Sequence, residues 1–238
     1  MPPVSREVAM IAPLAFYRVL PLHSPYMYLV LAIVTTFGAL ALIVDPSSAE
    51  QVLMPLVVLQ MFTASTGFAV PARRGHYDLL LTAGAGRLGI AAAHFLVSTA
   101  PGIAAWLVLG CVELVRGGGE SRVFAAGSVA ALMFVSSVTW AVTVALPCLS
   151  GGIIWLLAIV MLLVRTGGSQ YVVLATPPHS SPAWVAPVYA TCPFVLVGRS
   201  LSPSDAWVLM PGTALSVVSV AAALAWITRM NVPLEASQ

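Results

Sequence analysis

The sequence predicts an all-α integral membrane protein, and its composition and apolar runs carry that prediction. Of the 238 residues, 60% are hydrophobic and only 8% are charged, and the mean hydropathy is +0.99. Apolar runs long enough to cross the roughly 30 Å hydrocarbon core of a bilayer recur along the chain. A soluble domain needs charge on about a quarter of its residues. We therefore expect residues 1–238 to form one membrane domain.

Six apolar segments have the character of membrane-spanning helices. They cover Tyr26–Val44, Gln51–Val70, Leu88–Gly110, Val123–Leu146, Gly152–Val164 and Ala206–Thr228. Because an α-helix rises about 1.5 Å per residue, most of these segments reach across a bilayer. The fifth does so only by including the CLSGG stretch before it. The first five spans therefore occupy 26–164 and the sixth occupies 206–228.

The N-terminal segment 5–22 is apolar but interrupted. Pro13 and Pro21 break it, and it carries Arg6 and Arg18. A signal peptide needs an unbroken apolar stretch and a small-residue cleavage site. We therefore expect a helix that lies in the inner membrane interface.

The segment 165–205 is partly apolar and rich in proline. Its stretch 183–198 follows Pro182 and contains Pro187 and Pro193. Each proline removes a backbone donor that lipid cannot replace, which favours a broken re-entrant segment on the outer side before the last span. A seventh span over 183–198 is the alternative, and it would place the C-terminus outside.

The arginines between the spans indicate sidedness, because cytoplasmic loops carry an excess of basic residues. With the N-terminus inside, more arginines fall on the inner side than on the outer side. The inner set is Arg6, Arg18, Arg73, Arg74, Arg87 and Arg229, and the outer set is Arg116, Arg122, Arg165 and Arg199. Both termini are therefore predicted to be cytoplasmic, in a multi-pass protein of the plasma membrane.

The charged and metal-ligating residues exclude several classes of function. A net charge of +2 with scattered arginines lacks the clustered footprint of a nucleic-acid-binding protein. All 10 basic residues are arginine, and without lysine the chain has no P-loop for ATP hydrolysis. The 3 cysteines and 4 histidines form no metal-spaced cluster. We expect no metal site on this chain.

Ionisable residues are missing from the centres of the predicted spans. A carrier driven by an ion gradient usually needs one near mid-membrane. No Asp, Glu or Arg lies centrally in any span; His94 lies about two turns into the third span, and Glu113 lies at its outer end. The energy for any pumping must therefore come from elsewhere.

Polar side chains gather on the second and fourth spans. They are Gln60, Thr63, Ser65, Thr66, Ser136, Ser137, Thr139 and Thr143. They line a path, or they let helices approach closely and add hydrogen bonds between them, although membrane serines mostly bond the carbonyls of their own helix. Gln60 differs, because an amide in hydrocarbon is costly unless it meets a partner or water. An intramembrane serine hydrolase that pairs a fourth-span serine with His94 is a weaker alternative, since no recognisable motif is present.

The stretch PARRGHYDLLLTAGAGR, residues 71–87, predicts a short amphipathic helix. Its apolar side consists of Tyr77, Leu80 and Leu81. Arg74 and Asp78 lie four residues apart on another side, and AGAG ends the helix before Arg87 and the third span. A helix of under three turns is hardly stable alone in water, so it must dock against the membrane surface or a protein groove.

This loop resembles the one between the second and third spans of type-2 permeases of ATP-binding-cassette (ABC) exporters. In that family a basic residue, a glycine, an acid, a leucine run, a small-residue break and a closing arginine recur. The matching residues are Arg74, Gly75, Asp78, Leu79 to Leu81, Ala83 to Gly86, and Arg87. The family often has a lysine where this chain has His94, and a proline in the break, where this chain has only alanine and glycine. The layout of an interfacial helix, six spans and a broken outer segment is also similar.

The resemblance implies that the loop is a coupling helix seated in a cleft of a separate ATP-hydrolysing subunit. The implied coupling residues are Arg73, Arg74, Gly75, His76, Tyr77, Asp78, Leu80, Leu81 and Arg87. The chain would be a transport subunit and not an enzyme, with no cofactor of its own, and ATP and Mg²⁺ would bind to the partner. The implied partners are two ATP-binding-cassette subunits, a second permease copy, identical or related, and membrane lipid.

In such permeases the second and fifth spans face the translocation path, which makes Gln60, Thr63 and Thr66 the candidate path residues. The fifth span, with IIWLLAIVMLLV, offers no polar side chain. The expected cargo of this exporter is therefore hydrophobic or amphipathic: a drug, a lipid-like molecule or an antibiotic peptide. Two alternatives stay open. The arginines of 71–87 anchor the loop to anionic lipid, or the chain is a stand-alone secondary carrier or channel without an ATPase partner.

Overall fold

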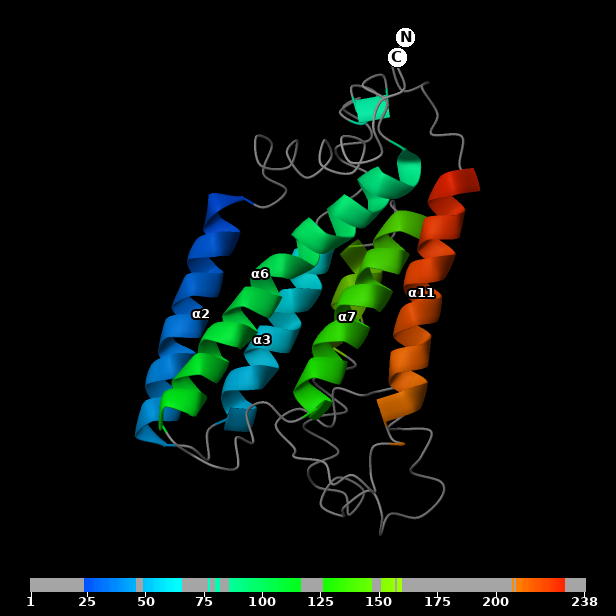
Figure 1. The fold of residues 1–238 in the computed structure, drawn as a ribbon. Coiled ribbons are helices and arrows are strands. Elements are labelled where there is room, and N and C mark those ends of the chain that lie inside the picture. The colour runs from blue at the N-terminus through cyan, green and yellow to red at the C-terminus, as the bar shows by residue number, and fades with distance from the viewer. Residues whose placement is uncertain are drawn as a thin grey trace, which may run out of the picture.

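The computed structural model describes residues 24–45, 49–65, 77, 80–81, 86–116, 126–146, 151–156, 158–159, 207 and 209–229. Within these ranges the regular structure is helical, and no strand is present. The long helices are α2 (Pro25–Val44), α3 (Ala49–Ala64), α6 (Arg87–Arg116), α7 (Ala126–Ala145) and α11 (Leu209–Arg229). Figure 1 shows them as a bundle of roughly parallel rods.

The helices run up and down the bundle. In the view of Figure 1, α2 and α6 run downward, whereas α3, α7 and α11 run upward. As a result, the start of α2, the start of α6 at Arg87 and the end of α11 at Arg229 lie at one end of the bundle, which we call the arginine end.

Four helices are long and apolar enough to cross a membrane. They cover Pro25–Val44, Arg87–Val115, Gly127–Ala145 and Leu209–Arg229, and a shorter apolar helix covers Gln51–Ala64. The prediction of a helical membrane protein is confirmed to this extent. These segments agree with the first, third, fourth and sixth predicted spans, and α3 covers most of the second. The total of six spans stays a prediction.

Two helix ends illustrate the local physics. α2 begins at Pro25, whose missing N–H is no loss in the first turn, and the Ser24 hydroxyl before it accepts a hydrogen bond from Met27 N at 3.4 Å. α6 continues past the predicted end at Gly110 as far as Arg116. The residues after Gly110 are less apolar on average, but they contain no glycine or proline that would break a helix. The helix therefore continues beyond the end of the apolar run.

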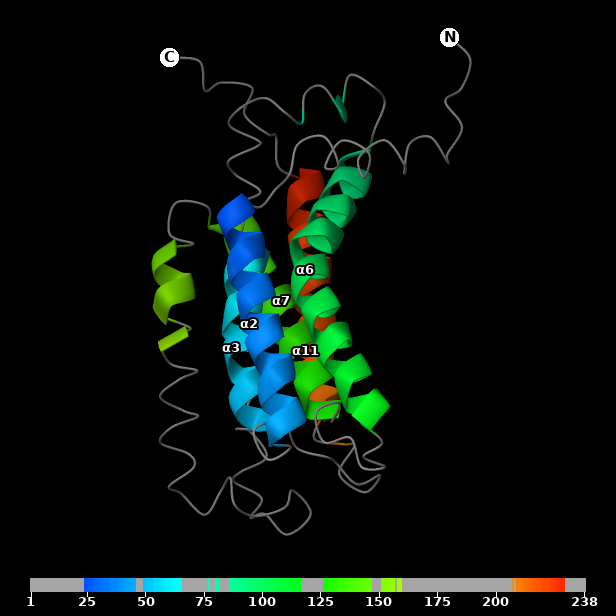
Figure 2. The ribbon, with the colours of Figure 1, turned by 90° about the vertical axis from the view of Figure 1, so that its left-hand side faces the viewer.

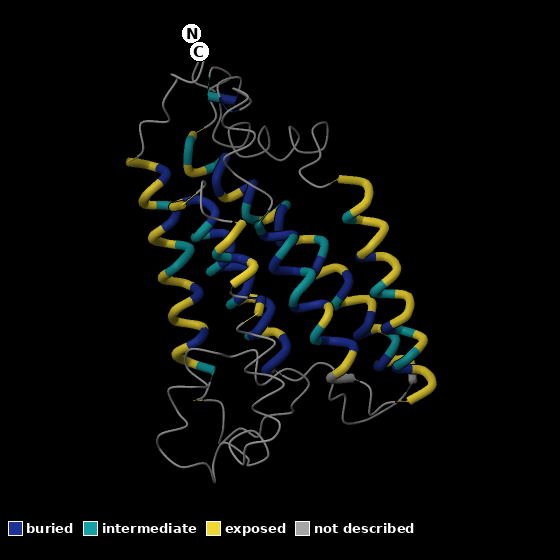
Figure 3. Tube along the Cα trace, turned by 180° about the vertical axis from the view of Figure 1, so that it is seen from behind, coloured by how far each residue is buried: buried dark blue, intermediate teal, exposed yellow. Residues whose placement is uncertain are grey.

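The hydrophobic core is centred on α3. Leu53, Leu56 and Val57 are fully buried there and belong to one cluster with residues of α2, α6 and α7. α2 approaches α3 closely at Gly38, where an added Cβ would lie 2.6 Å from Val52 Cγ1. Many large apolar residues of α2 and α11 are instead exposed, and Figure 3 marks the exposed residues of these helices in yellow. An apolar exterior of this kind is what a hydrocarbon environment requires.

Two further packings complete the described bundle. α7 and α11 lie side by side along their lengths, and α11 presents small buried residues, Gly212, Ser216 and Ala223. Small residues let membrane helices approach closely. On the other side of the bundle, the helical stretch 151–156 stands outside α3 (Figure 2), and Trp155 meets Phe62 edge to face at 5.1 Å between ring centroids.

Three predicted features lie outside the described residues. They are the interfacial helix 5–22, the broken segment 165–205 with its stretch 183–198, and the second half of the fifth span. Each of them stays a prediction.

Candidate functional site

A buried amide joins α3, α6 and α7 inside the bundle. Gln60 of α3 is fully buried, and its Nε2 donates to the Thr99 carbonyl of α6 at 3.1 Å and to Ser136 Oγ of α7 at 2.8 Å. Because a carbonyl oxygen can only accept, this contact fixes the orientation of the amide. Thr63 Oγ1 lies 2.9 Å from Gln60 Oε1 and 2.8 Å from the Gln60 backbone carbonyl, so its single proton is shared between these two acceptors. We call Gln60, Thr63, Thr99 and Ser136 the amide cluster.

The amide cluster sits beside an irregularity in α6. Pro101 has no N–H, so the helix lacks the hydrogen bond to the Val97 carbonyl at that turn. The next residue, Gly102, is buried, and an added Cβ there would collide with the Gln60 carboxamide. Absence of a side chain at Gly102 therefore provides the space that the amide occupies.

The hydroxyls around the amide cluster mostly bond their own helix. Ser98 Oγ donates to the Phe95 carbonyl at 2.9 Å, Ser136 Oγ to the Leu132 carbonyl at 2.7 Å and Thr143 Oγ1 to the Thr139 carbonyl at 2.8 Å. These hydroxyls donate within their own helix, as expected for membrane serines, and the expected bonding between helices is found where Ser136 Oγ also accepts from Gln60.

His94 lies on α6 and is fully buried against α7. Trp140 Nε1 donates to His94 Nδ1 at 2.9 Å, and Phe95 meets the Trp140 ring edge to face at 5.2 Å between centroids. Because an indole N–H can only donate, Nδ1 must be unprotonated, which leaves the neutral imidazole with its proton on Nε2. Protonation of Nδ1 would break the bond to Trp140.

The same contacts bear on the serine hydrolase alternative. Ser136 Oγ accepts from Gln60 and donates to Leu132, while His94 Nδ1 accepts from Trp140. A nucleophile–base pair needs a hydrogen bond from the serine to the histidine. Ser136 and His94 Nδ1 have other partners instead.

The described part of the predicted coupling helix packs on α6 of its own chain. Tyr77 and Leu80 are buried in a cluster with Ile90 and Ala93, and Leu81 packs against its edge. These residues lie at the arginine end, where Figure 1 shows them in teal above the start of α6. The described residues of the predicted apolar side therefore pack against α6 of the same chain.

The remaining predicted site residues are placed as follows. Arg87 is the first residue of α6, where it is partly buried and interacts with the surrounding chain. Gln60 and Thr63 face the interior of their own bundle, and their role in a translocation path stays a prediction. The residues outside the described ranges are Thr66, Arg73, Arg74, Gly75, His76 and Asp78.

The burial of Glu113 was not predicted from the sequence. Glu113 lies within α6 and is only 6% exposed, and its Oε2 has no hydrogen-bond partner in the described part of the chain. Across these same ranges no three His, Cys, Asp or Glu side chains gather as metal ligands.

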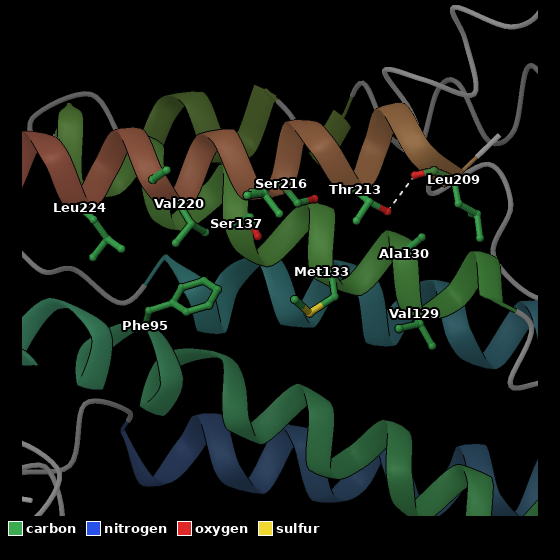
Figure 4. Close-up of a pocket in the computed structure, with 12 residues that line it drawn as sticks. Phe95, Val129, Ala130, Met133, Ser137, Leu209, Thr213, Ser216, Val220 and Leu224 are labelled. Carbon is green, nitrogen blue, oxygen red and sulfur yellow. Dashed lines mark hydrogen bonds between the residues drawn. The ribbon is translucent and has the colours of Figure 1, made fainter. Parts of the chain in front are cut away.

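A groove between α7 and α11 was not predicted at all. It encloses about 680 Å³, and Figure 4 shows Phe95 of α6 at one end and Val129 of α7 with Leu209 of α11 at the other. Its lining is apolar except for the hydroxyls of Ser137, Thr213 and Ser216. Of this lining the sequence singled out only Ser137, and the other residues are each typical of a packed or lipid-facing helix.

No protein-family model matches the chain, and searches of curated proteins and of solved structures found no match. The functional argument therefore depends on the residues themselves.

Proposed function

We propose that the chain is the transmembrane permease subunit of an ABC exporter, moving a hydrophobic or amphipathic cargo with energy from ATP hydrolysed by a separate subunit. The observation that supports it most directly is the attachment of the predicted coupling helix to α6. Tyr77 and Leu80 are buried against Ile90 and Ala93.

This attachment matters mechanically. A loop that reports the closure of an ATPase must move a membrane helix, and a slack connection would absorb the displacement. Burial of Tyr77 and Leu80 on α6 gives a packed contact, and packed side chains transmit displacement because protein interiors have low compressibility. By helical spacing, Arg74 and Asp78 lie on a different side, and we assign them to the contact with the ATPase.

Three of the described membrane helices have no acidic residue or histidine within the span that could couple to an ion gradient, whereas α6 contains the buried His94 and Glu113. In the described helices α2, α7 and α11, the only charged residue is Arg229, the last residue of α11. The chain contains no lysine for a P-loop, so an energy source on another polypeptide fits both absences.

The proposed assembly follows from the span number and from sidedness. The start of α2 and the end of α11 share the arginine end of the bundle (Figure 1). With the arginine-rich loop and Arg229 inside, this end is cytoplasmic and both termini are in the cytoplasm. A six-span chain is half a transporter, so the working unit contains two permease copies, identical or related, and two ATPase subunits in the plasma membrane.

The first test asks whether the chain associates with an ATP-hydrolysing subunit. The tagged chain, solubilised in mild detergent from its own membranes, should co-purify with an ATP-binding subunit and show Mg²⁺-dependent ATP hydrolysis. The chain alone should show none. Recovery of the chain without an ATP-binding subunit, together with ATP-independent transport in vesicles, would favour the stand-alone carrier or channel.

The second test asks whether the loop couples. Leu80 is unsuitable, because its replacement also disrupts packing on α6. Arg74→Glu should preserve assembly of the complex but abolish cargo-stimulated ATP hydrolysis. Arg122→Glu is the matched control, an equal charge change on the predicted outer side, and it should leave stimulation intact. Normal stimulation in Arg74→Glu would reject the coupling role and favour a loop that only anchors to lipid.

A further inference from the structure

The groove between α7 and α11 has the size of a ligand site. Its volume of about 680 Å³ falls in the range of roughly 300–1,000 Å³ typical of small-molecule pockets. α7 and α11 both contain candidate membrane spans, Gly127–Ala145 and Leu209–Arg229, so the groove lies at the level of the bilayer.

The lining selects for an uncharged occupant. It contains no charged residue. Of its hydroxyls, Thr213 Oγ1 donates to the Leu209 carbonyl and Ser216 Oγ to the Gly212 carbonyl, each at 2.8 Å. Figure 4 shows the first of these bonds. Because those protons already bond the helix backbone, burial of hydrocarbon in the groove gives a more favourable binding free energy than burial of a polar group.

The shape of the groove favours a single chain. From Leu209 to Leu224 along α11 the lining spans about 22 Å at about 1.5 Å per residue. The volume of about 680 Å³ is spread along that length, so the groove is long and narrow, a shape that suits an extended hydrocarbon chain better than a compact ligand.

The two ends of the groove differ in their aromatic residues. Phe95 and Leu224 line the end towards the arginine end (Figure 4), and the Phe95 ring meets edge to face the ring of Trp140, which is itself bonded to His94. At the opposite end, Trp207 precedes α11 and is exposed. Tryptophan is enriched where a membrane helix meets the head groups, which places the polar part of an occupant at that end.

We propose that this groove binds one acyl chain of a bilayer phospholipid, with its head group near Trp207 and its chain end near Phe95. Bilayer lipid is the occupant because acyl chains are the solvent that surrounds these two helices. Val217, on the lining, is 64% exposed and therefore open to that solvent. The proposal does not depend on the transport function.

The test uses two neighbouring alanines of α11. Ala221 and Ala222 are both exposed, but only Ala221 belongs to the lining. The full chain is placed in vesicles of palmitoyl-oleoyl phosphatidylcholine that contain a trace of the same lipid with a diazirine near its acyl chain end. After photolysis, the labelled residues are mapped by mass spectrometry and normalised to label on the exposed face of α2.

In the wild-type chain, Met133 and Val220 of the lining should carry several times more label than the exposed face of α2. Ala221→Phe should lower the label in the groove about tenfold, the factor expected when two methylene groups lose their burial. Ala222→Phe should leave it within about twofold, because its ring points elsewhere on the same helix. Equal label in the groove and on α2, equal effects of the two variants, or no label in the wild-type groove would each overturn the proposal.

Discussion

Replacement of Gly102 by alanine tests the most detailed part of the structure, the amide cluster. Gly102 is buried in α6, and the Cβ of an alanine would collide with the Gln60 carboxamide. The carboxamide must then move away from α6. That movement breaks its hydrogen bonds to the Thr99 carbonyl and to Ser136 Oγ.

The size of the effect comes from opposing contributions. Alanine in place of glycine favours the helix by about 1 kcal/mol. Overpacking costs about 2 kcal/mol, and two hydrogen bonds inside a membrane protein are worth about 0.6 kcal/mol each. The net loss is about 2 kcal/mol if the amide finds new partners. It rises to about 4 kcal/mol if the amide stays buried and unsatisfied.

A double-mutant cycle separates this collision from a general intolerance of α6. The free energy of unfolding is measured in mixed micelles for the wild type, Gly102→Ala, Gln60→Ala and the double variant. On the Gln60→Ala background the two shortest contacts are removed, and Gln60 Cβ lies at 3.2 Å. Gly102→Ala should then be nearly neutral, giving a coupling energy of about 2–4 kcal/mol.

Gly152 provides the control, because it is also helical and an added Cβ there meets nothing within 4 Å. Gly152→Ala should be neutral or stabilise by up to about 1 kcal/mol. If Gly102→Ala behaves like Gly152→Ala, or if its effect simply adds to that of Gln60→Ala, the described position of the amide is wrong.

Three further substitutions test other contacts. Gly38→Ala should lower the free energy of unfolding by about 1–3 kcal/mol through its contact with Val52 Cγ1. Adding Val52→Ala to the same chain should restore most of that free energy. If stability is not restored, the described approach of α2 and α3 is wrong. Trp140→Phe removes the hydrogen bond to His94 Nδ1 and should cost about 1–3 kcal/mol, measured in the same micelles, and an unchanged stability would contradict that bond. Leu80→Ala empties a buried position against α6, so amide exchange at the start of α6 should accelerate while that of α2 does not change; unchanged exchange at both would mean that the loop does not pack there.

The positions of the long helices were predictable because lipid allows few alternatives. A chain that crosses hydrocarbon must satisfy every backbone N–H and C=O internally, which makes a long apolar run a helix. The predicted span Tyr26–Val44 therefore agrees with α2, Pro25–Val44, to one residue at its start. The predicted end of α6 was wrong, because the helix continues for several residues after the apolar run ends. For the same reason the burial of Glu113 in those last turns was not predicted.

The need for partners at Gln60 was predictable, but their identity was not. A buried amide in hydrocarbon must be satisfied, and the sequence alone marked this residue as unusual. Its partners Thr99 and Ser136 lie 39 and 76 residues away along the chain. Their contact depends on how α3, α6 and α7 cross, and therefore on side-chain packing that no local pattern encodes. The groove escaped prediction for the same reason, since it is a property of two helices and not of either one.

The first half of α6 connects the features that distinguish this chain. Ile90 packs against Tyr77 and Leu80 of the loop, Phe95 lines the groove, and the Thr99 carbonyl accepts a hydrogen bond from the amide of Gln60. These three residues occupy about 14 Å of one helix at about 1.5 Å per residue. They all precede Pro101, where the helix lacks a backbone hydrogen bond and bends more easily than elsewhere. Under the proposed coupling role, a displacement of the loop would reach the groove wall and the amide cluster through this one segment of α6.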